Sequence, residues 1–282
     1  MKLLLDVGNS RVKWAFVSAG GVAAHGEAGH DDEASLEPLL GARHAPDDIR
    51  IANVAGASTG ARLAARLRER FHVVPVFARS ARQGAGVRNG YTDPAQLGVD
   101  RWLAICAAYD RYRAAVCVVD AGTATTIDLV TASGEHRGGL ILPGLRLMEL
   151  ALMRGTSDLA PLSRASNVGT EGRIPASPRA DPEAPVLDLG RDTAAAIRYG
   201  ALRATTCLVW DCLEEFSDPE SSVTVSPTLL VTGGAASLLE AALLSKAVSG
   251  GALTPAATRI EHRPQLVLEG LALDPQCFVA DR

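Results

Sequence analysis

One short pattern occurs twice in this chain of 282 residues and limits the folds open to it. LLLDVGNS near the start and VVDAGTA further on both run through an apolar stretch, an aspartate, one further residue, a glycine and polar residues. A second stretch of β-type residues follows each copy, which predicts two strands joined by a tight turn. Repetition of one supersecondary unit indicates a duplicated domain. We therefore expect two related lobes, residues 1–114 and residues 115–282.

The rest of the chain alternates between strand and helix patterns. Besides the strands of the two repeats, we expect strands at residues 49–54, 73–77, 138–142 and 228–231. Helices are expected at residues 59–71, 97–113, 145–153, 191–216, 236–244 and 264–273. This alternation predicts an α/β fold with mixed sheets flanked by helices. Residues 161–190 are polar and rich in proline, which predicts a long surface loop.

Composition narrows the classes of protein. The net charge is −4 and no run of Lys or Arg occurs, so we expect no nucleic-acid partner. The first apolar run is broken by Asp6, and no apolar stretch approaches the ~18 residues of a membrane helix, so we expect no membrane partner and a cytoplasmic protein. The five cysteines contain no CxxC pair and are expected to be buried free thiols. The six histidines lack the spacing of a zinc site.

The first turn, at Asp6 to Ser10, has groups that suit a phosphate. It is neither a Walker A loop nor a dinucleotide fingerprint, because a strand follows it. Backbone N–H groups around Gly8 could point at a phosphate, and Ser10 and Lys13 add a hydroxyl and an ammonium. Asp6 could hold Mg²⁺ directly or through water. The alternative is an ordinary Asn-containing hairpin turn, which is favoured if this turn is considered alone.

The second turn repeats this arrangement. Thr123 could donate to a phosphate and Asp120 could bind a cation, whereas the alternative is a Thr-rich hairpin. Two matching turns in a duplicated chain favour the functional interpretation over that alternative. A third junction, at Gly233 and Gly234, would let the backbone approach a flat ligand.

Asp100 and Arg101 stand where a loop runs into a helix. The helix dipole stabilises a carboxylate in the first turn, and a deprotonated carboxylate is what a kinase base requires. Arg101 could bind a substrate carboxylate through two parallel hydrogen bonds. The alternatives, a helix cap for Asp100 and a surface arginine for Arg101, are equally supported by these residues alone.

In combination these motifs carry a resemblance that runs through nearly the whole chain. The segments are DVGNSRVKWA, Tyr91 through LGVDRW, VVDAGTATTID, GGLILPG and GRDTAAAIRYGAL. The chain resembles type III pantothenate kinases, of the superfamily of sugar kinases, acetate kinase and actin. The resemblance implies two ribonuclease H-like lobes of the actin-like ATPase fold with the nucleotide between them. It also implies ATP with Mg²⁺, and a homodimer with a composite active site.

The resemblance also implies site residues. It assigns Asp100 as the catalytic base, Asp6 to Mg²⁺ and Asp120 to a monovalent cation, K⁺ or NH₄⁺. ATP contacts fall to Asp6, Val7, Gly8, Asn9, Ser10, Arg11, Val12, Lys13 and Thr123. Pantothenate contacts fall to Tyr91, Gly98, Val99, Asp100, Arg101 and Thr193, the last reaching the neighbouring subunit's site. Ser10 replaces a threonine common in the family but keeps the hydroxyl.

The expected reaction is transfer of the ATP γ-phosphoryl group to the primary hydroxyl of pantothenate, giving 4′-phosphopantothenate, the first step toward coenzyme A. One alternative is a kinase for another small hydroxylated substrate. Another is a non-catalytic regulator, like the accessory factors for gene expression that resemble this family. The joint presence of Asp6, Asp100, Arg101 and Thr123 argues against a regulator. An actin-like polymerising protein would need larger insertions.

Overall fold

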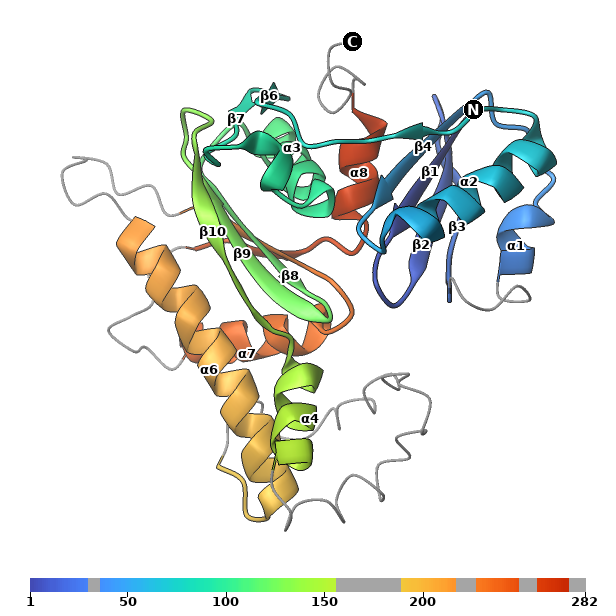
Figure 1. Cartoon of the computed structure of the whole chain (residues 1–282). Helices are drawn as coiled ribbons and strands as arrows, with labels where there is room; N and C mark the ends of the chain where they lie inside the picture. Colours follow the sequence, from blue (N-terminus) through green and yellow to red (C-terminus); the bar gives the residue numbers. More distant parts are fainter. Residues whose placement is uncertain (30–35, 156–188, 217–226, 249–257, 274–282) are drawn as a thin grey trace. The chain divides into compact units, whose positions relative to one another are not determined.

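The computed structural model describes residues 1–29, 36–155, 189–216, 227–248 and 258–273 (Figure 1). They form two compact units. The first contains Met1–Ala114, Val130–Gly138 and the described residues from 265 to 273. The second contains Ala115–Leu129 and the described residues between 139 and 264. The predicted lobe boundary at residues 114 and 115 is one of the points where the chain passes between units, and the assignment of domains stays a prediction.

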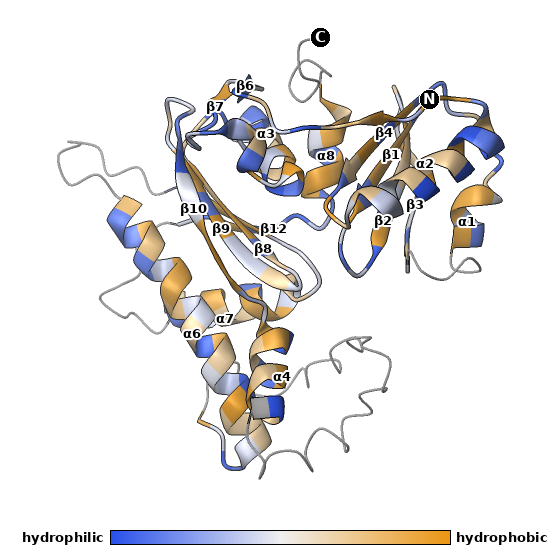
Figure 2. Ribbon diagram, in the orientation of Figure 1, coloured by the Kyte–Doolittle hydropathy of each residue, from blue (hydrophilic) through white to orange (hydrophobic). Residues whose placement is uncertain are grey.

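The first five-stranded sheet has the order β3-β2-β1-β4-β5. Its strands are β1 Lys2–Val7, β2 Val12–Ser18, β3 Gly21–Ala28, β4 Asp48–Asn53 and β5 Val76–Phe77. β1 runs antiparallel to β2 and parallel to β4, so the sheet is mixed. Leu3, Leu4 and Leu5 are all buried, because a central strand covered on both faces needs an unbroken apolar run. Figure 2 shows this hydrophobic colouring along β1 and β4.

The second five-stranded sheet repeats the order of the first. It reads β10-β9-β8-β11-β12, with β8 Val116–Ala121, β9 Ala124–Val130, β10 His136–Pro143, β11 Thr228–Thr232 and β12 Ile260–His262. β8, which carries Asp120, again pairs in parallel with the strand that follows the crossover. Each aspartate-tipped strand therefore occupies the centre of its own sheet. The predicted α/β fold with two duplicated mixed sheets and flanking helices is confirmed.

The helices are α1 Glu37–Leu40, α2 Ala57–Phe71, α3 Val99–Tyr112, α4 Leu145–Gly155, α6 Thr193–Phe216, α7 Ala236–Val248 and α8 Leu266–Ala272. A short hairpin, β6 Gln83–Gly84 and β7 Val87–Arg88, and a 3₁₀ turn at Pro94–Gln96 precede α3. No helix in the described part of the chain is long and apolar enough to cross a membrane. The predicted proline-rich loop at 161–190 lies, up to residue 188, outside the described residues.

The cysteines follow the expectation in part. Cys106, Cys117 and Cys212 are buried free thiols. Burial raises the pKa of the Cys117 and Cys212 thiols, which keeps them protonated and unreactive. Cys207 is exposed on α6, so burial was wrong for this residue. Cys277 lies outside the described residues.

Candidate active site

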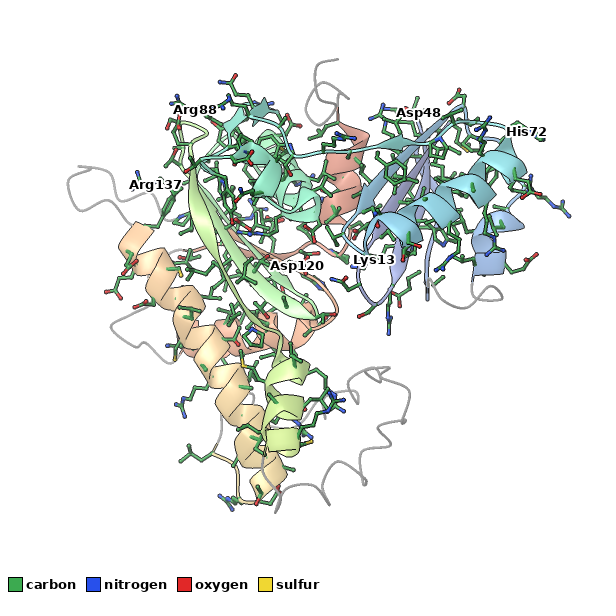
Figure 3. The ribbon with its side chains drawn as sticks, viewed as in Figure 1. Lys13, Asp48, His72, Arg88, Asp120 and Arg137 are labelled. Atoms are coloured by element: carbon green, nitrogen blue, oxygen red, sulfur yellow. The ribbon has the colours of Figure 1, made fainter. Side chains whose placement is uncertain are left out.

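The two strands that flank the first turn place an aspartate directly opposite a lysine. In the antiparallel register of β1 and β2, Asp6 pairs with Lys13 (Figure 3 labels Lys13). Directly opposed residues share one face of the sheet, with Cβ atoms roughly 4.5–5.5 Å apart. Both side chains are half-buried. The two groups that the sequence assigned to Mg²⁺ and phosphate therefore lie side by side at the mouth of the turn.

The other residues of this segment divide into three kinds. Val7 and Val12 are fully buried in the core, so only their backbone groups could face a nucleotide. Arg11 Nη1 donates to Glu27 Oε1 at 2.5 Å. Asn9 and Ser10 are exposed at the tip of the turn. Of the side chains expected to contact ATP in this segment, those of Asn9 and Ser10 are therefore exposed at the tip, whereas those of Val7 and Val12 are buried.

Glycine amides close both turns. Gly8 N–H donates to the Arg11 carbonyl at 3.0 Å, and Gly122 N–H donates to the Ala124 carbonyl at 3.0 Å. These amides are used within the turns, so the phosphate donors are to be sought among the following residues. In the second turn that residue is Thr123, which is exposed and whose carbonyl accepts from Gly144 N–H at 2.9 Å.

Gly233 packs closely against the Asp120 turn, and its expected approach to a flat ligand stays a prediction. Its φ is +94°, and a Cβ there would lie 2.4 Å from Asp120 Oδ1 and 2.6 Å from the Ala121 carbonyl carbon. The parallel register brings this about, because Thr232 lies opposite Asp120 (labelled in Figure 3). A Cβ on Gly234 would meet nothing within 4 Å. The two glycines therefore have different roles, and only Gly234 borders open space.

Asp100 occupies the first turn of α3, as expected, but it is not the N-cap. The N-cap is Gly98, which makes no side-chain cap bond. Asp100 Oδ1 accepts from Arg101 N–H at 2.8 Å, and a Cβ on Gly98 would lie 2.7 Å from the same oxygen. The carboxylate thus leans over the start of the helix, where the helix dipole stabilises its charged form. Gly98 therefore takes the N-cap position, while the Asp100 carboxylate accepts from a first-turn amide, and its role as a base stays a prediction.

Arg101 is buried, which rules out the alternative of a surface arginine. The residue is 7% exposed. Nη1 donates to the Tyr91 hydroxyl at 2.9 Å, and the guanidinium carbon lies 5.7 Å from the centre of the Tyr91 ring. A buried guanidinium beside a phenol is a site that favours an anion.

His136, at the start of β10, packs against Tyr91 beside Arg101. It was not among the site residues expected from the sequence. It is 3% exposed and its ring lies parallel to that of Tyr91, with centroids 6.0 Å apart and an interplanar angle of 8°. Its Nδ1 faces Gly90 N–H at 3.4 Å. No spacing in the sequence could have revealed it, because Gly90 and His136 are 46 residues apart.

Thr193 begins α6 in the second unit and is exposed. Asp192 Oδ1 accepts from Ala195 N–H at 2.8 Å, as an N-cap does, so the position of Thr193 is fixed by the helix start. A Cβ on Gly190 would overlap Ala196 N at 2.1 Å, which requires glycine there. The structure gives Thr193 a defined backbone position and a side chain open to a partner.

The donors around Asp6 fit Mg²⁺ bound chiefly by a nucleotide. Mg²⁺ prefers oxygen ligands and is usually held by one or two carboxylates, substrate phosphates and waters. Asp6 supplies one carboxylate. Within the described ranges, no cluster of three or more His, Cys, Asp or Glu side chains could hold a metal. This set of donors suits Mg²⁺ that arrives with ATP.

Comparisons with known proteins agree on one family. The sequence model of the type III pantothenate kinase family matches residues 2–215. A type III pantothenate kinase from Azoarcus sp. (strain BH72) is 36% identical over 283 residues, covering 100% of this chain and 93% of the relative. One from Halorhodospira halophila is 35% identical over 279 residues, covering 96% of each.

Solved structures are similar in fold. A Campylobacter jejuni protein described as a Baf family transcriptional activator gives a TM-score of 0.53 at 19% identity, covering 96% of this chain and 95% of that one. A ROK family glucokinase from Streptomyces griseus, in complex with glucose and AMPPNP, gives 0.50 at 12% identity, covering 96% and 97%. At these identities the likeness shows a shared fold, that of actin-like sugar kinases.

Proposed function

This chain belongs to the type III pantothenate kinase family, and from that premise we propose how its residues divide the reaction. The protein is a pantothenate kinase, a phosphotransferase that phosphorylates pantothenate in coenzyme A biosynthesis. The observation that carries the residue assignment is the start of α3. There a carboxylate leans over the helix N-terminus and the next residue is a buried arginine.

Asp100 acts as the general base in this proposal. Its carboxylate lies in the first turn of α3, where the helix dipole favours an anion, and it orients the primary hydroxyl of pantothenate and accepts its proton. Phosphoryl transfer passes through a loose transition state, so positioning of the hydroxyl matters more than its early deprotonation. Gly98 and Val99 contribute backbone to this part of the site.

Arg101 binds the pantothenate carboxylate. Its Nη1 donates to the Tyr91 hydroxyl at 2.9 Å, and a planar guanidinium suits recognition of a carboxylate. Thr193, exposed at a fixed helix start, would support the same end of the substrate from a neighbouring subunit, as the family resemblance implies.

The first turn binds ATP. Lys13 and the backbone of the turn offset phosphate charge, with Asn9 and Ser10 as polar donors at the tip. Asp6 would hold Mg²⁺, which supplies charge neutralisation at the phosphates when it is bound.

Thr123 donates to the nucleotide from the second turn. Asp120, whose Oδ1 lies close to the Gly233 backbone, would be the ligand for a monovalent cation, K⁺ or NH₄⁺.

A homodimer is the assembly that the exposed apolar residues favour. β10 is an edge strand of its sheet, and Leu140 and Ile141 on it are 45% and 64% exposed. Leu147 and Leu152 on α4 are 39% and 49% exposed (Figure 2 shows the hydrophobic colouring of α4). Exposed apolar groups on a strand that ends its sheet, as judged from the described residues, favour a covering partner, and a second copy is the commonest one. The free thiols favour a cytoplasmic location.

Replacement of Asp100 by Asn tests the assignment of the base. Loss of a general base costs about 10²–10⁴-fold in turnover, whereas the ATP contacts of the first turn do not change. We expect kcat to fall by that factor and the Kd for ATP, measured by calorimetry, to stay near the wild-type value. The control is Asp110→Asn on the same helix, where the carboxylate pairs with Arg113 at the surface. Wild-type turnover of Asp100→Asn would overturn the assignment.

A further inference from the structure

His136 is linked to the proposed carboxylate site through one aromatic ring. The imidazole stacks on Tyr91, and the Tyr91 hydroxyl accepts from Arg101 Nη1 at 2.9 Å. All three residues belong to the same compact unit. His136 and Arg101 are 3% and 7% exposed, so both are fixed by packing. Tyr91 therefore lies between a buried imidazole and a buried guanidinium.

The loop that carries Tyr91 is closely fitted to the backbone of His136. A Cβ on Gly90 would lie 1.9 Å from the His136 carbonyl oxygen, so this approach requires glycine. Asn89, itself buried, accepts from Tyr91 N–H at 3.0 Å and donates to the Ala81 carbonyl at 3.1 Å. The backbone of the loop is thus set by Asn89 and Gly90. The orientation of the Tyr91 ring depends on what packs against its face.

The His136 side chain meets the loop at Gly90 and at Tyr91, and these contacts differ in strength. The distance from Gly90 N to His136 Nδ1 is 3.4 Å, beyond the usual 2.7–3.2 Å of a good N–H hydrogen bond. The parallel rings, with centroids 6.0 Å apart, lie within the range of favourable aromatic pairs. The stacking contact is therefore the stronger candidate for orienting Tyr91.

We propose that His136 is a positioning residue for substrate selection: its ring holds Tyr91 so that the phenol keeps Arg101 aimed at the substrate carboxylate. The inference depends on the proposed role of Arg101. The Tyr91 hydroxyl accepts from Arg101 Nη1, so a shift of the phenol changes the direction of that N–H, and recognition of a planar carboxylate by two hydrogen bonds is sensitive to such a shift. The phosphoryl transfer itself does not involve His136.

The test compares pantothenate with panthenol, in which a hydroxymethyl group replaces the carboxylate. For His136→Ala, we expect KM for pantothenate to rise about two- to tenfold, the range that an aromatic contact supports. The kcat, the KM for ATP and the kcat/KM for panthenol should stay at the wild-type values. The selectivity for the carboxylate, the ratio of the two kcat/KM values, therefore falls.

Two conservative variants separate the contacts. His136→Phe keeps the ring and loses the acceptor, and we expect it to restore selectivity. His136→Asn keeps an acceptor and loses the ring, and we expect it to behave like His136→Ala. If His136→Ala fails to fold, the difference between these two variants carries the test. Unchanged selectivity in His136→Asn, or an equal fall in kcat for both substrates, overturns the proposal.

Arg101→Met distinguishes failure of this inference from failure of the function on which it rests. Loss of selectivity in Arg101→Met together with wild-type selectivity in the His136 variants overturns only the role of His136. Wild-type selectivity in Arg101→Met overturns the proposed carboxylate site itself.

Discussion

At the residue scale, Gly98 controls where the carboxylate of Asp100 can lie. A Cβ at position 98 would stand 2.7 Å from Asp100 Oδ1, too close for any real contact. The φ of Gly98 is −53°, which alanine also adopts, so Gly98→Ala should keep the fold and displace only the carboxylate. A misplacement near 1 Å can cost about 10²-fold. We expect kcat to fall by roughly 10–100-fold with an unchanged melting temperature.

Gly20→Ala is the matched control for this substitution. Gly20 is exposed in the turn between β2 and β3, and an added Cβ would make an ordinary 3.7 Å contact with Ser18 Oγ. Both kcat and the melting temperature should remain at the wild-type values. Full activity of Gly98→Ala would show that the carboxylate position seen here is not needed for catalysis.

The adjacent glycines 233 and 234 give a second comparison. Gly233→Ala places a side chain at φ +94° and against the Asp120 turn, and positive φ alone costs about 1–2 kcal/mol. We expect a lower free energy of unfolding in urea and a higher KM for ATP. Gly234→Ala meets nothing within 4 Å and should change neither quantity by much. Equal effects at both positions would contradict the role assigned to Gly233.

At this scale the sequence predicted where residues lie along the strands and helices better than it predicted which atoms they contact. Its assignments of site residues stay predictions, but the positions of Asp6 and Asp100 at the ends of regular elements agree with the pattern. The use of Gly8 and Gly122 amides inside the turns did not follow from it, because a motif does not say where an N–H points. His136 was missed because its contact with Tyr91 depends on tertiary folding.

At the scale of elements, Arg50 ties the last helix to the first sheet. It is 5% exposed on β4, and its Nη1 donates to the carbonyls of Leu271 and Leu273 at 2.8 and 2.7 Å, at the end of α8. Arg50→Met would leave these carbonyls without their donor, at a cost of about 1–3 kcal/mol for a buried group. We expect lower stability and faster hydrogen exchange of the α8 amides.

Arg70 provides the control because it makes similar bonds in water. Its guanidinium donates to the carbonyls of Leu40 and Ala42, but the residue is exposed. Solvent can replace those bonds, so Arg70→Met should cost at most about 1 kcal/mol and leave exchange in α8 unchanged. If the two variants were equally stable, burial of the Arg50 bonds would not matter.

Element boundaries show which signals the sequence carries. The buried strands β1 and β8 and the helices α2 and α7 lie close to the expected ranges, because burial imposes an apolar pattern. β3, with the sequence GVAAHGEA and mostly exposed residues, has no such pattern and was not predicted. β5 is confined to Val76–Phe77 instead of residues 73–77, because Pro75 lacks the N–H that a strand needs.

At the scale of the whole molecule, the proposed composite site makes a prediction about mixed dimers. Asp100→Asn and Thr193→Ala alter residues that would come from different subunits at each site. When the two variants are mixed and allowed to exchange subunits, half of the dimers are mixed and one of their two sites is intact. We expect activity to rise to about a quarter of the wild-type value, measured as pantothenate-dependent ATP consumption.

Ile141→Asp controls for the assembly. This residue is 64% exposed on the edge strand β10, and a charge there should prevent pairing of copies through this surface. Introduced into both partners, it should abolish the regained activity and give a monomer in sedimentation experiments. Mixed dimers that regain nothing, although exchange is complete, would rule out a site shared between subunits.

The duplication could be predicted from two short segments, whereas the division into compact units could not. The second strand of the second repeat ends at Val130, and the described residues of the first unit include Val130–Gly138 and those from 265 to 273. Local patterns report which elements form, but not which elements pack together after the chain returns. The likeness of the two sheets became clear only from their common strand order.

The hydrogen bonds that close the two turns also bear on the thermodynamics of nucleotide binding. Gly8 and Gly122 donate to carbonyls of their own turns, so the shape of each turn is maintained by the chain and does not depend on a phosphate. A loop that must be ordered by its ligand loses conformational entropy on binding, and a turn that is already closed avoids much of this loss. Nucleotide binding by this kinase should therefore carry only a small entropic penalty from these two turns.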